Sequence, residues 1–265
     1  MLKINSDTNK ERLVIIIMAT IGTLATHLLS KHLQIDTVTS ASIVGIISGL
    51  TSYILAKEKC YRYSEAIYCG TFTGMTSLMF FTNGIDALIA GIVTGIVFVL
   101  SLNIFKGFGG KLGSIAFLSV FISIIILNKW TIINDLQTQA VTRFSYDDLV
   151  ILFFVSLIGI SLTYYFAIFA DGNSVLSSSL LSLAFVLVIN SLFTPSTTLS
   201  SILPPFFMGA TFVGMSSKKF LGNFNRHLYI AILYFAVYFL FINSFIGFGG
   251  KLGLMAFIAV SAVAF

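Results

Sequence analysis

The segment Gly107 to Gly113, GFGGKLG, decides the fold of this chain, because the same seven residues return as Gly247 to Gly253. An ungapped comparison at this offset of 140 residues, from Thr71/Thr211 to Val120/Val260, gives 23 identical pairs among 50. An internal repeat must be recognised before the rest of a sequence is interpreted, since it defines the structural unit. The chain is therefore an internal duplication.

The composition is that of a membrane protein. Of the 265 residues, 57% are hydrophobic and only 9% are charged, whereas about 25% of the residues in a soluble domain are charged. The formal net charge of +5 does not indicate a nucleic-acid partner, because the Lys and Arg residues lie between apolar runs, where membrane topology accounts for them. The expected partner is the lipid bilayer.

A membrane helix needs roughly 20 apolar residues, and this criterion predicts an all-α, polytopic protein with about ten transmembrane helices. The expected helices run approximately over residues 13–29, 39–56, 66–81, 87–105, 111–127, 149–169, 175–193, 201–217, 228–245 and 251–265. This gives an N-terminal tail (1–12), repeat 1 (13–127), a linker (128–148) and repeat 2 (149–265), each repeat with five helices.

The basic residues predict the orientation, since loops on the cytoplasmic side are enriched in them. An N-terminus on the inside of the cytoplasmic (inner) membrane places eleven of the 15 Lys and Arg residues inside. Five helices cross the membrane an odd number of times, so the second repeat enters from the opposite side and the linker lies outside. The repeats are therefore expected to be inverted.

This arrangement resembles the five-plus-five inverted-repeat transporters and channels. The likeness is one of topology over the whole chain and does not extend to a signature motif. It implies a binding site near the membrane midplane, at the interface of the repeats and beside interrupted helices.

The two glycine segments are the candidate substrate-binding site. A glycine-rich segment that leads into a helix exposes backbone N–H groups at a helix N-terminus, which favours an anion, and the lysine adds a full positive charge. Two Asn residues precede the segments by four positions. The candidates are Asn103, Gly107, Phe108, Gly109, Gly110, Lys111, Asn243, Gly247, Phe248, Gly249, Gly250 and Lys251.

A different interpretation of the same residues stays open. Glycine supplies positive φ angles in a tight turn, and a lysine beside such a turn extends to the lipid headgroups. The last helix is also short, with 15 residues from Lys251 to Phe265, or about 22 Å. Either the glycine segment starts inside the membrane or the natural chain continues beyond Phe265.

A second duplicated patch, TFxGM followed by hydroxyl residues, precedes each glycine segment. Its hydroxyl side chains are candidates for lining a transport pathway. Small and hydroxyl residues also let membrane helices pack closely, so helix packing is the alternative. The pathway candidates are Thr71, Thr76, Ser77, Thr211, Ser216 and Ser217.

These features predict a permease that moves a small polar or anionic solute through a site near the duplicated segments. The alternatives are a passive channel with a filter of backbone carbonyls and a membrane scaffold or subunit of a larger complex. We expect no enzymatic activity, metal or cofactor, because no nucleophile with a base is apparent and Leu112 follows Lys111 where a nucleotide loop needs Ser or Thr. The solute and any coupling ion stay open, and a homo-oligomer is compatible with the sequence.

Overall fold

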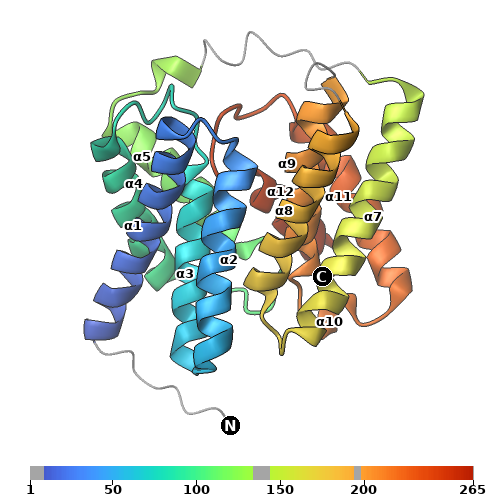
Figure 1. Cartoon of the computed structure of the whole chain (residues 1–265), viewed down its shortest axis with the longest axis horizontal. Coiled ribbons are helices and arrows are strands. Elements are labelled where there is room, and N and C mark those ends of the chain that lie inside the picture. The colour runs from blue at the N-terminus through green and yellow to red at the C-terminus, as the bar shows by residue number, and fades with distance from the viewer. Residues whose placement is uncertain (1–8, 134–143, 194–197, 265) are drawn as a thin grey trace.

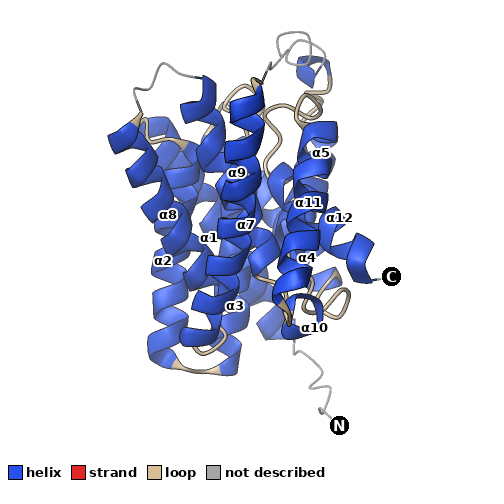
Figure 2. Cartoon of the chain, turned by 90° about the vertical axis from the view of Figure 1, so that its right-hand side faces the viewer, coloured by secondary structure: helices blue, strands red, loops and turns tan. Residues whose placement is uncertain are grey.

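The computed structural model describes residues 9–133, 144–193 and 198–264, and within these ranges it contains helices and turns but no strand (Figures 1 and 2). The expected all-α class is confirmed for the described residues. The helices are α1 (Asn9–His32), α2 (Thr37–Leu55), α3 (Glu58–Gly74), α4 (Gly84–Leu100), α5 (Lys111–Ile126), α7 (Tyr146–Phe169), α8 (Ser174–Leu192), α9 (Thr198–Gly214), α10 (Lys218–Leu221), α11 (Phe224–Phe241) and α12 (Lys251–Ala264).

Five of the described helices are long and apolar enough to cross a membrane, namely α1, α2, α7, α8 and α11. Four shorter apolar helices accompany them: α4, α5, α12 and residues 199–214 of α9. The described part of the chain therefore has five helices that could span a membrane by length and composition, whereas the count of ten spans stays a prediction.

Several boundaries differ from the expected ones. The third helix was expected over 66–81, but α3 begins at Glu58 and ends at Gly74, because charged residues such as Lys, Glu and Arg form helix readily even where the chain is not apolar. The fourth and ninth helices were expected to reach Phe105 and Phe245, yet both residues lie in turns with φ of +51°. The chain thus leaves the helix several residues before each glycine segment.

Side-chain caps determine where several helices begin, because they satisfy backbone N–H groups that lack a helical partner. Asp36 accepts from Thr39 N at 2.9 Å at the start of α2. Ser145 and Asp148 form a capping box, so α7 starts at Tyr146, inside the expected linker 128–148. Residues 134–143 of that linker lie outside the described residues.

The helices of the second half (α7 to α12) repeat the order of those in the first half (α1 to α5). Helices α3, α4 and α5 begin at 58, 84 and 111, and α9, α11 and α12 begin 140 residues later, at 198, 224 and 251. Helices α1 and α7 have 24 residues each, and α2 and α8 have 19 each. The correspondence between the halves thus includes the first two helices of each half, whose sequences match less well.

The two halves pack against each other through α2 with α8 and through α5 with α12. In Figure 2, α2 and α8 lie on one side of the molecule, and α5, α11 and α12 lie on the other. Figure 1 shows that α1 joins α2 at the upper end of the molecule, whereas α7 joins α8 at the lower end. Helices α1 and α7 therefore run in opposite directions.

Candidate functional site

Each glycine segment is bound by a hydroxyl side chain from the other half. Gly109 N donates to Ser216 Oγ at 3.1 Å, and Gly249 N donates to Thr76 Oγ1 at 3.2 Å. Each hydroxyl in turn donates to the carbonyl three residues earlier in its own chain segment, at 2.7 Å in both cases. The N–H groups of Gly109 and Gly249 are therefore occupied by the protein, and we call this pair of interactions the reciprocal clamp.

Backbone hydrogen bonds repeat the same exchange. Ser77 N donates to Gly247 O at 2.8 Å, and Ser217 N donates to Gly107 O at 2.9 Å. All four residues were predicted to bind solute or to line a pathway. In the structure these four residues join the glycine segment of one half to the duplicated patch of the other.

Thr71 and Thr211, the remaining pathway candidates, are fully buried. Their hydroxyls donate to the carbonyls of Tyr68 and Met208, at 2.7 Å in each case. Thr211 also lies 2.7 Å from Ser178 on α8. None of the six predicted pathway residues lines any of the four cavities described below.

The glycines permit α5 and α12 to cross at backbone contact. A Cβ atom on Gly113 would lie 2.4 Å from Gly253 Cα, and one on Gly110 would lie 2.4 Å from Phe257 N. In the reciprocal contact, a Cβ atom on Gly250 would lie 2.4 Å from Phe117 N. Because the start of each helix meets the second turn of the other, α5 and α12 are antiparallel where they cross.

Four cavities form a series through the molecule, and each shares lining residues with the next. Cavity A, about 350 Å³, lies where α2 begins and α8 ends, and it shares Thr37 and Pro205 with cavity B of about 230 Å³. Cavity B shares Phe72 and Phe212 with the small cavity C of about 60 Å³. Cavity C shares Lys111 with cavity D of about 320 Å³.

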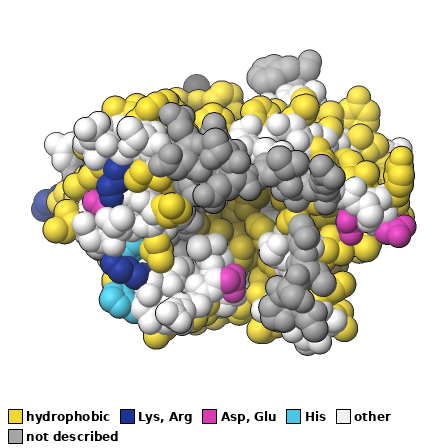
Figure 3. Space-filling model, turned by 90° about the horizontal axis from the view of Figure 1, so that it is seen from above, with side chains coloured by type: hydrophobic (Ala, Val, Ile, Leu, Met, Phe, Trp, Pro, Cys, Tyr) yellow, Lys and Arg dark blue, Asp and Glu magenta, His cyan; other side chains and the backbone are white. Residues whose placement is uncertain are grey.

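The ends of this series lie at opposite ends of the helix bundle. The start of α2, beside cavity A, is uppermost in Figure 1, and the start of α3, beside cavity D, is lowermost. Figure 3 views the upper end, where hydrophobic side chains floor a recess near the middle and the charged side chains lie mostly towards the margins. The series thus runs along the direction of the long helices.

An aromatic pair separates the two sides of the series. The rings of Phe72 on α3 and Phe212 on α9 have centroids 4.6 Å apart, and these residues are only 1% and 2% exposed. They occupy equivalent positions in the duplication. Sequence reasoning considered the hydroxyl residues of the TFxGM patch and missed its phenylalanine, although the phenylalanine is duplicated as well.

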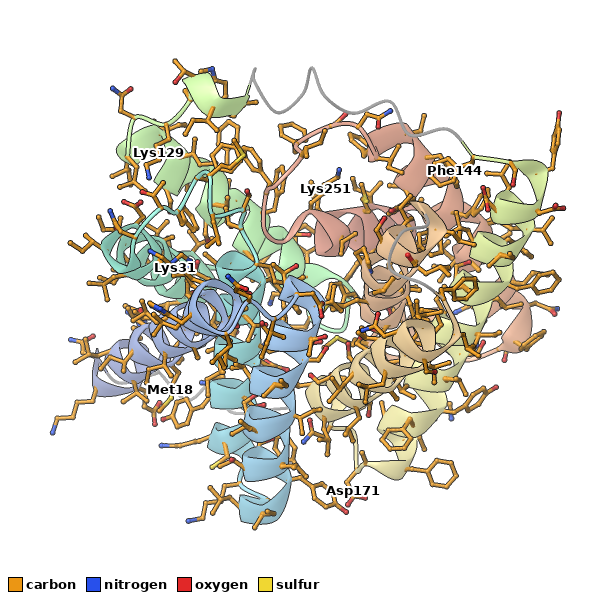
Figure 4. The ribbon with its side chains drawn as sticks, turned by 45° about the horizontal axis from the view of Figure 1, so that its top comes forward. Met18, Lys31, Lys129, Phe144, Asp171 and Lys251 are labelled. Atoms are coloured by element: carbon orange, nitrogen blue, oxygen red, sulfur yellow. The ribbon has the colours of Figure 1, made fainter. Side chains whose placement is uncertain are left out.

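The two predicted lysines line cavities on opposite sides of this pair, but their surroundings differ. Lys251 lines cavity B, and its Nζ donates to Ile242 O at 2.7 Å. Figure 4 shows Lys251 between the two halves, whereas Lys31 and Lys129 lie at the margin. Lys111 lines cavities C and D, and in the part of the chain that the structure describes its Nζ has no hydrogen-bond acceptor.

Cavity D also contains charged residues of α3 that sequence reasoning missed. Glu58, Arg62 and Glu65 line it together with Lys106 and Lys111. They were overlooked because the third helix was expected to start after them. Their spacing of four and three residues places them on one helix face, and this periodicity was the signal available in the sequence.

The remaining predicted residues are divided among the cavities. Asn103 is exposed and lines cavity D, whereas Asn243 is exposed and lines none of the four. Gly107 lines cavity D, and Phe108 and Gly110 line cavity C. Besides Lys251, the predicted residues of the second segment that line cavity B are Gly247, Phe248, Gly249 and Gly250.

Comparison with known proteins adds no family assignment. No protein-family model, no curated protein and no solved structure matches this chain. The chain itself has apolar helices of membrane-spanning length and a series of four cavities, three of them lined by residues of both halves.

Proposed function

We propose that this chain is an integral membrane transporter that moves a small polar or anionic solute across the cytoplasmic membrane. The observation that carries the proposal is the series of cavities A to D, which follows the long helices; residues of both halves line cavities A, B and C, and residues of the first half line cavity D. A protein that served only as a scaffold would have no need of cavities in series through its interior. The solute site lies beside the glycine segments, where the cavities meet.

The proposal includes inverted repeats and ten membrane-entering helices. It is supported by the opposite courses of α1 and α7, by the reciprocal clamp and by the antiparallel crossing of α5 and α12. Helix α5 has 16 residues, or about 24 Å at a rise of about 1.5 Å per residue. It is shorter than a hydrocarbon core of about 30 Å, so in our proposal α5 starts within the membrane, and α12, which crosses it in the opposite direction, runs to the other face.

Transport requires that the solute reach each side in turn, and the aromatic pair is the proposed barrier. Phe72 and Phe212 line both cavity B and cavity C, so a solute passing between them must separate the rings. Because α3 and α9 carry these residues at equivalent positions, a tilt of one half against the other would open one side and close the other. This is the motion expected of inverted-repeat carriers.

The orientation follows from the basic residues. With the N-terminus inside, cavity D and its charged residues face the cytoplasm, and cavity A faces the outside. The positive-inside rule supports this assignment, because Lys57, Lys59, Arg62 and Lys106 all lie near the cavity D end. The positions of these residues relative to an actual bilayer are part of the proposal.

The experiment is reconstitution of the purified chain into liposomes, with uptake measured for a panel of labelled anions, zwitterions and neutral solutes. Saturable uptake of a polar or anionic solute is the expected result. Uptake that rises linearly with concentration would favour the passive channel. Absence of uptake for the whole panel, with correctly inserted protein, would contradict the transporter and leave the scaffold interpretation.

A further inference from the structure

Cavity D contains two opposite charges that do not satisfy each other. Glu65 from α3 and Lys111 from α5 both line it, and for each the strongest charge interaction is with the other. Within the described residues they form no ion pair at 4 Å or less, and neither side chain makes a hydrogen bond to protein. A charge inside a membrane protein is costly unless it is paired, so this arrangement leaves room for a molecule between the two groups.

The equivalent site in the other half lacks this property. Position 205, which corresponds to Glu65 in the duplication, is a proline that lines cavity B. Lys251, which corresponds to Lys111, already donates to Ile242 O at 2.7 Å. The identical seven-residue segments therefore end in two different environments, and Lys111 is the lysine whose charge is available to a ligand.

The first turn of α5 adds donors beside Lys111. The N-cap residue is Gly110, which has φ of +78° and provides no side-chain cap. A helix begins with N–H groups that have no partner within the helix, and the N-terminus carries about half a positive charge. Residues 110–113 line cavity C, which shares Lys111 with cavity D. A carboxylate at this junction would accept hydrogen bonds from the lysine and from the turn.

From this arrangement we propose that cavity D binds a small zwitterion, with its carboxylate at Lys111 and the first turn of α5 and its ammonium group at Glu65. The inference rests on the proposed transport function and specifies its substrate class, which includes α-amino acids and betaines. A simple anion would be attracted by Lys111 but repelled by Glu65. A simple cation would be attracted by Glu65 but repelled by Lys111. Only a molecule that carries both charges therefore matches both groups.

The other charges of the cavity are consistent with this assignment. Glu58 and Arg62 lie on the same face of α3 as Glu65, two turns and one turn nearer the helix start, and Lys106 is exposed in the turn before the glycine segment. These three groups line cavity D and together carry a net charge of +1. Glu65 is exposed and lies one turn further along α3 than Arg62, and Lys111 also lines cavity C. Glu65 and Lys111 are therefore the opposite charges nearest the rest of the cavity series, and they set the preference for the ligand.

The test measures binding separately from flux. The purified full chain is equilibrated with labelled L-alanine and glycine betaine as zwitterions, acetate as the anion, ethylamine as the cation and urea as the neutral solute. We expect saturable binding of a zwitterion and at least tenfold weaker binding of acetate and ethylamine. Binding of acetate alone, of ethylamine alone, or of none of the panel would overturn the inference.

Two variants and a control complete the test. Glu65→Gln should weaken L-alanine binding by at least tenfold, or about 1.4 kcal/mol, while acetate binding is retained or strengthened. Lys111→Met should weaken the binding of L-alanine and also the binding of acetate. Lys57→Met removes an exposed charge outside the cavity and should change neither by more than twofold. A variant that failed to fold would bind neither L-alanine nor acetate and would no longer elute as a monodisperse species. Loss of L-alanine binding with acetate binding retained in Glu65→Gln is therefore specific.

The two proposals fail differently. If liposomes take up acetate or urea saturably but no zwitterion, the substrate class is wrong and the transport function stands. If no solute is bound and none is taken up, both proposals are wrong.

Discussion

A methyl group added at Gly249 should dislodge the reciprocal clamp. A Cβ atom there would lie 2.2 Å from Phe72 O and 2.6 Å from Thr76 Oγ1, and real Cβ atoms do not approach backbone oxygen so closely. In Gly249→Ala the glycine segment must move away from α3, which lengthens the 3.2 Å hydrogen bond from Gly249 N to Thr76 Oγ1. Gly109→Ala should do the same, because its Cβ would lie 2.5 Å from Phe212 O.

The expected loss of stability has two parts. Overpacking of a tightly packed interior costs about 1–3 kcal/mol, and loss of a buried hydrogen bond costs roughly another 1 kcal/mol. Each single variant should therefore lose about 2–4 kcal/mol. Gly84→Ala is the matched control, because a Cβ atom at Gly84 would have no neighbour within 4 Å.

Reversible unfolding in mixed detergent micelles measures these differences directly. Gly249→Ala and Gly109→Ala should be destabilised to a similar extent, and Gly84→Ala should stay within about 0.5 kcal/mol of the original chain. If Gly249→Ala were as stable as Gly84→Ala, the close approach of the glycine segment to the opposite half would be refuted.

Three further outcomes are expected. Phe72→Ala should raise passive leak of small solutes through liposomes severalfold, because it removes half of the aromatic barrier; an unchanged leak would argue against that barrier. Lys129→Met should lower the free energy of unfolding by roughly 2 kcal/mol, since Lys129 Nζ lies 2.6 Å from the Asp86 carboxylate; equal stability would assign the pair no role. In a cysteine-free background, single cysteines at Asn103 and Ser201 should react with impermeant reagents from opposite sides, and reaction from one side would contradict the inverted arrangement.

The sequence alone was sufficient for the class of protein and for the equivalence of its halves. Apolar content and segment length predict membrane helices because the bilayer core excludes unpaired backbone groups. The ends of the helices were less predictable. Glu58, Arg62 and Glu65 were assigned to a loop because they are charged, yet they extend α3 by two turns. An apolarity criterion finds the part of a helix that lipid or protein buries and misses the part that lines a polar cavity.

The tertiary structure alone decided what the duplicated residues do. Periodicity in a sequence tells which residues share a helix face, but it does not tell which distant segment that face meets. Thr76 and Ser216 were predicted to line a pathway from their hydroxyl groups alone; that each also accepts a hydrogen bond from a glycine N–H of the other half was visible only in the packed structure. Phe72 and Phe212, one position away from the threonines of the same patch, line the cavities instead.

Lys111 and Lys251 show most clearly what the sequence determined and what only the tertiary structure decided. Lys111 and Lys251 lie in identical heptapeptides, so sequence reasoning assigned them one role. In the folded chain α3 brings Glu65 to the cavity of Lys111, while α9 brings Pro205 to that of Lys251. The electrostatic environment of a side chain depends on the groups that surround it in space, and the two residues that differ here, Glu65 and Pro205, each lie 46 positions before the lysine in the chain.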